Sequence, residues 1–201
     1  MDNRAKFILA GIVAVSYVVI RESAKSDSPI KAQPLESQVM RHRAAIWSAG
    51  VAYDVEPALI ASIMSAESSG LPQPPRLVEV SGGTDYVVGL MQIRLDTAYD
   101  HCDVFAASEL ENNRKNIECG TNYLRYLLDR FGLVQRAVSA YNAGPGNISV
   151  DPTERIRYVN PEYVRKVLGM IQRFRLLFMA YKGGNEYLDR FPGWKWEYVV
   201  P

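Results

Sequence analysis

The segment PALIASIMSAESSG, residues 57–70, decides how the chain begins to fold. Pro57 suits the first turn of a helix, and the small and aliphatic residues after it include no helix breaker, so the segment predicts a helix. At 100° per residue, Glu67 falls near the apolar face that carries Ile60 and Ile63. A carboxyl on that face loses hydration, which raises its pKa and suits a general acid near neutral pH. The plainer alternative is a solvated glutamate at a helix end.

Length and composition fit one domain with extensions. The 201 residues are 48% hydrophobic, which is ample for a core, and the net charge of +1 gives no footprint for nucleic acid. His42 and His101 are the only histidines and no C-x-x-C spacing occurs, so neither a metal site nor a cofactor is expected. Cys102 and Cys119 can pair in an oxidising compartment, closing a loop worth roughly 3 kcal/mol; two reduced thiols are the alternative.

The N-terminal segment, residues 1–26, predicts the compartment. Residues 7–20 are mostly apolar and are flanked by Lys6 and Arg21. As a helix this run is about 21 Å long, shorter than a standard membrane span and equally matched to a signal-peptide core. We interpret it as an N-terminal hydrophobic helix that anchors the chain in a membrane, with a cleaved signal peptide as the alternative. In both cases the cationic N-terminal side predicts that the rest lies outside the cytoplasm, in the periplasm.

The remainder predicts a mostly α single domain with at most a small β insert. Residues 27–37 are expected to be a flexible tether, 38–180 the domain and 181–201 an aromatic C-terminal extension. The extension is expected to wrap the core, and sugar stacking or membrane contact are its alternatives. Helical patterns cover residues 38–51, 57–66, 112–131, 134–143 and a long run from 161, whereas 71–83 predict a loop and 85–93 a short extended pair.

Two later motifs carry chemical information. Gly89-Leu90-Met91-Gln92-Ile93 and Ala140-Tyr141-Asn142-Ala143-Gly144 each place an amide beside bulky apolar groups, with glycines that let backbone approach a ligand. Together with Glu67-Ser68-Ser69-Gly70, in that order, they resemble the three signature motifs of lytic transglycosylases of the soluble-lytic-transglycosylase type. These are lysozyme-like enzymes that cut peptidoglycan. The resemblance covers roughly residues 40–170 and implies a lysozyme-like α-helical domain.

The resemblance implies a role for each matching residue. Glu67 matches the single catalytic carboxyl, which protonates the β-1,4 glycosidic oxygen between N-acetylmuramic acid and N-acetylglucosamine. As a carboxylate it then takes the proton of the muramic O6, which leaves a 1,6-anhydromuramoyl end. Gln92 matches a substrate-contacting amide, and Met91 packs beside the cleft or in the core. Tyr141 matches a tyrosine whose hydroxyl lies close to the catalytic carboxyl, although its hydroxyl can instead be satisfied by backbone, and Asn142 helps to shape the site.

The lone carboxyl agrees with this substrate class. An ordinary glycosidase uses two carboxyls, whereas a 2-acetamido sugar can offer its own carbonyl oxygen to the anomeric carbon. Asp85 and Asp96 flank the second motif, but a turn residue and a helix N-cap explain them better. The chain departs from the family pattern in the longer segment Leu71–Val88, where Ser81 is a candidate substrate-contacting serine. That insert is expected to reshape a subsite or act as a lid, with a solvated loop as the alternative.

Three functions follow as hypotheses. The first is a peptidoglycan lytic transglycosylase that opens the cell wall locally, with secretion-apparatus or virion proteins as partners. The second is a hydrolysing lysozyme of the goose type, which shares the lone glutamate. The third is a non-catalytic adaptor or virion component that binds glycan strands.

Overall fold

The computed structural model describes residues 34–80, 82–151 and 158–192. All of them belong to one compact unit, Ala32–Pro201. The predicted anchor or signal peptide, residues 1–26, lies outside this described part. Among the helices that are described, none is both long enough and apolar enough to cross a membrane.

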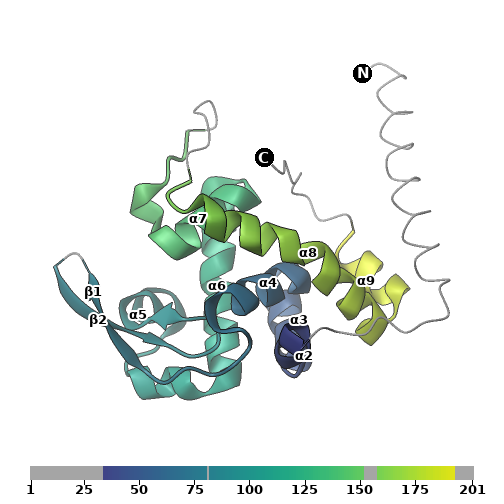
Figure 1. Cartoon of the computed structure of the whole chain (residues 1–201), viewed down its shortest axis with the longest axis horizontal. Helices are drawn as coiled ribbons and strands as arrows, with labels where there is room; N and C mark the ends of the chain where they lie inside the picture. Colours follow the sequence, from purple (N-terminus) through teal and green to yellow (C-terminus); the bar gives the residue numbers. More distant parts are fainter. Residues whose placement is uncertain (1–33, 81, 152–157, 193–201) are drawn as a thin grey trace. The chain divides into compact units, whose positions relative to one another are not determined.

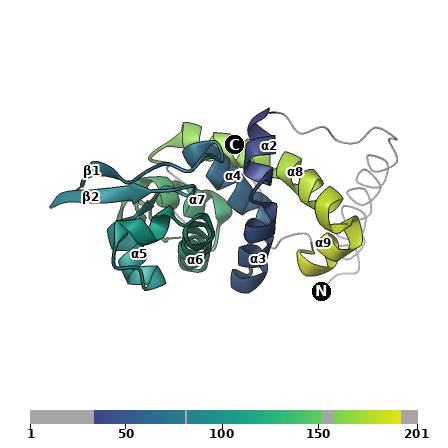
Figure 2. The ribbon, with the colours of Figure 1, turned by 90° about the horizontal axis from the view of Figure 1, so that it is seen from below.

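Helices make up most of the domain, as predicted. They are α2 (Pro34–Met40), α3 (Arg43–Tyr53), α4 (Pro57–Ser68), α5 (Leu95–Cys102), α6 (Asn113–Phe131), α7 (Val134–Ala143), α8 (Pro161–Lys182) and α9 (Gly184–Arg190), with 3-10 turns η1 (Ala107–Glu111) and η2 (Pro145–Asn147). Figures 1 and 2 place α6 between α5 and α3. Two predicted boundaries shift, because α2 already begins inside the expected tether 27–37 and α8 continues past residue 180.

Helix α4 is the buried centre of the domain. Every residue from Pro57 to Ser65 is buried, and α8 packs along the helix. The helix ends at Ser68, its C-cap Ser69 has a left-handed φ of 60°, and the chain turns at Gly70. A Cβ on Gly70 would lie 2.6 Å from the backbone nitrogen of Val39, so only glycine lets this turn pack against α2. Because α4 is buried on all sides, the position of Glu67 near its C-terminal end is fixed.

A three-stranded antiparallel sheet takes two of its strands from the predicted insert Leu71–Val88 and the third from the chain just after it. Its strands β1 (Arg76–Val80), β2 (Gly83–Val88) and β3 (Ile93–Arg94) lie in sequential order. The β1–β2 hairpin projects beyond the helices in both ribbon views (Figures 1 and 2). The predicted loop at 71–83 was therefore wrong for residues 76–80, which gain a partner strand in β2. Ser81 lies outside the described residues, so its predicted contact with substrate stays a prediction.

The C-terminal extension covers the core as far as it is described. Tyr187 and Phe191 are buried, and their rings lie 6.0 and 5.6 Å from that of Trp47. The Tyr187 hydroxyl donates to the buried Glu56 carboxylate (2.7 Å), which also accepts from Arg175 Nε (2.6 Å). This network ties α9 to the start of α4, so the domain continues beyond residue 180. Residues 193–201 lie outside the described part.

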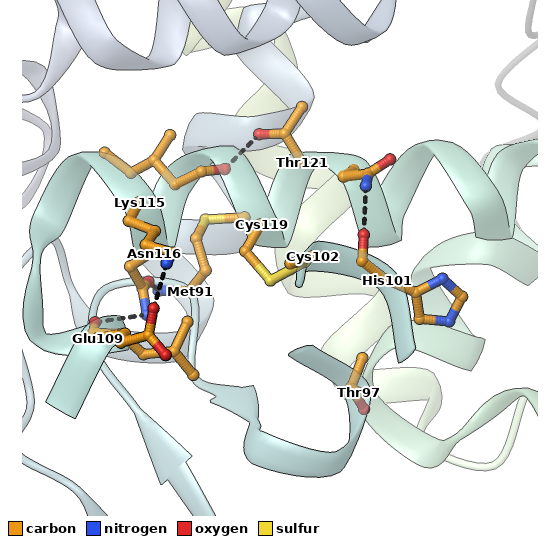
Figure 3. Close-up of a disulfide and its surroundings, with 12 residues drawn as sticks. Met91, Thr97, His101, Cys102, Glu109, Lys115, Asn116, Cys119 and Thr121 are labelled. Atoms are coloured by element: carbon orange, nitrogen blue, oxygen red, sulfur yellow. Dashed lines mark hydrogen bonds and ion pairs between the residues drawn. A yellow bond between two sulfur atoms is a disulfide. The ribbon is translucent and has the colours of Figure 1, made fainter. Parts of the chain in front are cut away.

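A disulfide joins the end of α5 to the middle of α6. Cys102 and Cys119 are bonded, with their Cα atoms 5.4 Å apart (Figure 3). Neither cysteine is therefore a free thiol. The link holds α5, which follows directly on β3, against the long helix α6.

Candidate active site

One cleft gathers four of the residues singled out from the sequence. Glu67, Gln92, Tyr141 and Asn142 all line a cleft of about 340 Å³. They come from the end of α4, the turn between β2 and β3, and the end of α7. Met91 does not reach the cleft, because its side chain is fully buried and belongs to the core.

Glu67 has the perturbed acidity that its helical position predicts. Its side chain is half-buried, and burial raises the pKa of this carboxyl from 4.5 to about 7. Two neighbours act against burial and lower the pKa: a hydrogen bond from Tyr163 and the positive charge of Lys166. Lys166 is held near by its own hydrogen bond to the Ala66 carbonyl (3.2 Å). Near neutral pH the carboxyl is thus close to the midpoint of its titration.

Tyr163, on the first turn of α8, supplies the hydroxyl that contacts Glu67. Its Oη donates to Glu67 Oε1 at 2.5 Å, and burial together with the charge of Glu67 raises the pKa of Tyr163 well above its usual value. Asn160 caps α8 by accepting from the Tyr163 N–H (3.1 Å), and its Nδ2 donates to Asn142 Oδ1 (3.2 Å). No catalytic or binding role was predicted for Tyr163, because its contact with Glu67 joins residues 96 positions apart in the sequence.

The hydroxyl of Tyr141 is satisfied by backbone, which was the alternative expectation for this residue. Its hydroxyl donates to the Met91 carbonyl at 2.9 Å. It still lies near the catalytic candidate, since burial and then the charge of Glu67 raise the pKa of Tyr141 well above its usual value. Tyr141 therefore lies near the carboxyl without bonding to it. Tyr163 is the hydrogen-bond donor, and Tyr141 fixes the second motif to α7.

The turn that carries Gln92 is held by the buried side chain of Asn116 on α6. Asn116 Oδ1 accepts from the Met91 N–H (2.8 Å), and its Nδ2 donates to the Val88 carbonyl (2.9 Å). Figure 3 shows Asn116 beside Met91. A Cβ on Gly89, where φ is 80°, would lie 2.2 Å from Asn116 Nδ2, so the motif requires glycine there. Gln92 itself has a left-handed φ of 48°, and its Nε2 donates to the Gly89 carbonyl (2.8 Å).

The first and second motifs are joined directly. The hydroxyl of Ser68 donates to the Leu90 carbonyl at 2.7 Å. Since Ser68 follows Glu67 on α4, this bond sets the position of the carboxyl relative to the Gln92 turn. This bond, between residues 22 positions apart in the sequence, thus holds the two motifs together behind the cleft-lining residues Glu67 and Gln92.

Glu67 is the sole carboxylate among the described residues that line the cleft. Asp85 and Asp96, the other acidic candidates, line a separate hollow and both pair with Arg94, with 3.1 Å between Arg94 Nε and Asp85 Oδ2. No cluster of three or more metal-ligating side chains occurs within the described ranges. The arrangement therefore provides one acid of near-neutral pKa, an adjacent hydroxyl donor and two amides.

Comparisons with known proteins agree with the motifs. The family model described as "Transglycosylase SLT domain" matches residues 44–155. An "Endo-type membrane-bound lytic murein transglycosylase A" of Citrobacter koseri is 35% identical over 122 residues, which are 55% of this chain and 57% of that protein. A "Membrane-bound lytic murein transglycosylase C" of Actinobacillus pleuropneumoniae is 30% identical over 140 residues, which are 58% of this chain and 36% of that protein.

Among solved structures, an inactive mutant of the lytic transglycosylase Slt from Pseudomonas aeruginosa has a TM-score of 0.49 and 19% identity. The match covers 87% of this chain and 30% of that one. The chain covers less than two thirds of the length of each of these relatives.

Proposed function

The chain belongs to the transglycosylase SLT domain family, and from that premise we propose that it is a peptidoglycan lytic transglycosylase. The observation that carries this proposal is the lone carboxyl of Glu67, with a pKa of about 7, in a cleft whose described lining holds no second carboxylate. An enzyme with a single acid depends on its substrate for the other half of the chemistry, and a 2-acetamido sugar can supply it. The names of its relatives, lytic murein transglycosylases, support the same substrate.

In the proposed first step Glu67 acts as a general acid. Its proton passes to the glycosidic oxygen as the bond from the muramic anomeric carbon breaks, and the N-acetylglucosamine side leaves as an alcohol. The acetamido carbonyl of the muramic residue stabilises the anomeric carbon. A pKa of about 7 keeps a large fraction of the carboxyl protonated at neutral pH, which an ordinary exposed glutamate does not achieve.

In the proposed second step the same side chain acts as a base. The Glu67 carboxylate takes the proton of the muramic O6 while O6 bonds to the anomeric carbon, giving a 1,6-anhydromuramoyl end without consuming water. The Tyr163 hydroxyl, 2.5 Å from Oε1, stabilises the carboxylate between the two steps. Glu67 ends the cycle protonated and ready for another strand.

The remaining site residues position substrate in this proposal. Gln92, from the second motif, and Asn142, from the third, present side-chain amides to the glycan in the cleft. Tyr141 holds the Gln92 turn by donating to the Met91 carbonyl. The relatives' names include the word membrane-bound, which supports a chain held at a membrane with its domain on the periplasmic side. Service to a secretion apparatus or to phage penetration of the wall stays a prediction.

The test is product analysis by mass spectrometry after incubating the full chain with cell-wall sacculi. We expect anhydromuropeptides from the unchanged chain and none from Glu67→Gln. Glu118→Gln is the matched control, because Glu118 lies on α6 and pairs with Arg114 outside the cleft. Reducing muramic ends, heavier by one water, would establish the hydrolase instead, and sacculus binding without turnover would establish the adaptor.

A further inference from the structure

A row of side chains on the sheet forms part of the cleft wall. In the strand register Arg76 pairs with Val87, and Val87 pairs with Arg94. Directly opposed residues of neighbouring antiparallel strands project from the same face of a sheet, with Cβ atoms about 5 Å apart. All three residues line the cleft. Two guanidinium groups, separated by one valine, are therefore directed to the side on which Glu67 lies.

The two arginines differ in how their charge is balanced. Arg94 pairs with Asp85 and with Asp96, so its charge is largely neutralised within the protein. Arg76 is exposed and has no ion-pair partner among the described residues. Glu67, the cleft's described carboxylate, is already bonded to Tyr163. Arg76 thus offers an unbalanced cation with five N–H donors to whatever occupies this end of the cleft.

The backbone of Arg76 belongs to a paired strand and not to a free loop. The Gly89 N–H donates to the Gln73 carbonyl at 2.9 Å, which fastens the chain just before β1 to the start of the second motif. From there β1 is paired along its whole length with β2. The backbone at Arg76 is therefore fixed relative to the turn that carries Gln92, so the side chain starts from a defined point on the cleft wall.

The ligand that suits this position is a carboxylate. We propose that Arg76 binds a carboxylate of the muramoyl substituent, so that the insert selects glycan strands by the charge they carry. This inference rests on the proposed function and specifies the substrate of that cleft. The sugar rings of such a strand carry hydroxyls and acetamido groups, which are neutral. Its carboxylates lie on the lactyl ether arm when that arm is free, or on the peptide when the arm is amidated, and a guanidinium fork fits either.

The experiment measures binding by calorimetry in the Glu67→Gln background, with and without Arg76→Gln. The ligands are a peptide-bearing muramoyl oligosaccharide, a peptide-free one with its lactyl carboxylate, and a chitin oligomer without carboxylates. We expect Arg76→Gln to weaken binding of at least one carboxylate ligand by about three- to tenfold and to leave the chitin oligomer unchanged. Which carboxylate ligand responds identifies the source of the charge. Arg76→Lys should restore part of the affinity, and added salt should weaken carboxylate binding only when Arg76 is present.

Arg114→Gln is the matched control, because Arg114 is an exposed arginine on α6 that does not line the cleft. Equal loss for all three ligands, or no loss for any, would overturn the role of Arg76. Turnover by the otherwise unchanged chain is measured separately on sacculi. Absent turnover with selective binding refutes the proposed function alone, whereas turnover without selectivity refutes the Arg76 proposal alone.

Discussion

Replacing Tyr163 by phenylalanine removes the only hydroxyl that the described residues place on Glu67. The hydroxyl donates to the ionised carboxylate, so its loss disfavours the charged form and raises the pKa of Glu67. A hydrogen bond to a charged group is worth about 1.5–3 kcal/mol in a buried setting, and 1.36 kcal/mol corresponds to one pKa unit. Because Glu67 keeps some contact with solvent, we expect a rise of about one, from about 7 to about 8.

The assay is the initial rate of anhydromuropeptide release as a function of pH. Activity that needs protonated Glu67 falls as the pH rises through its pKa, so Tyr163→Phe should move this alkaline limb upward by about one pH unit. A carbon NMR titration of the Glu67 carboxyl gives the same pKa if the variant turns over too slowly. Tyr141→Phe is the control, since the Tyr141 hydroxyl donates to the Met91 carbonyl. A limb that moves in Tyr141→Phe and stays in Tyr163→Phe would refute the reasoning.

Three further outcomes follow from other contacts. Because the pKa of Glu67 is raised in the folded chain, this carboxyl is largely ionised between about pH 4.5 and pH 7 only when the chain is unfolded. The free energy of unfolding therefore falls as the pH rises through this window. Glu67→Gln should therefore match the unchanged chain near pH 4 and exceed it by up to about 3 kcal/mol near pH 8 in urea unfolding. Replacing Cys102 and Cys119 by serine opens a loop of sequence separation 17 and should lower stability by about 3 kcal/mol, seen as a lower thermal midpoint. Asn116→Ala leaves the buried Met91 N–H without its acceptor and should destabilise the domain by about 3 kcal/mol in the same urea assay, with lowered activity.

The helices were predictable because their signals are local. Residues 134–143 were expected to be helical, and α7 has these bounds, since Gly132 before it and Gly144 after it both adopt positive φ. The hairpin was only half predicted, because the prolines before Arg76 favoured a loop there. The pairing of β1 depends on β2, a non-local contact that the pattern of five residues does not reveal.

The site divides in the same way. The raised pKa of Glu67 could be predicted from its place on a helix face, which is a local property. The two hydroxyls could not be told apart, because the motif order draws attention to Tyr141 while the hydrogen bond comes from Tyr163. Only the packing of α8 along α4 brings Tyr163 to Glu67 across 96 residues of sequence. Gln92 and Asn142 line the same cleft as Glu67 because the elements that carry their motifs meet there, and their contact with substrate stays a prediction.

A side chain that must act first as acid and then as base needs both of its forms to be accessible. Burial alone would favour the protonated form so strongly that the carboxylate required for the second step would be costly. Tyr163 and Lys166 counteract burial, one by a hydrogen bond and the other by charge, and the pKa of Glu67 remains at about 7. At neutral pH the free-energy difference between the protonated and ionised forms of Glu67 is then small compared with the activation free energy of the reaction. Both counteracting groups lie on α8. The packing of α8 against α4 therefore sets the pKa of Glu67, on which the proposed two-step reaction relies.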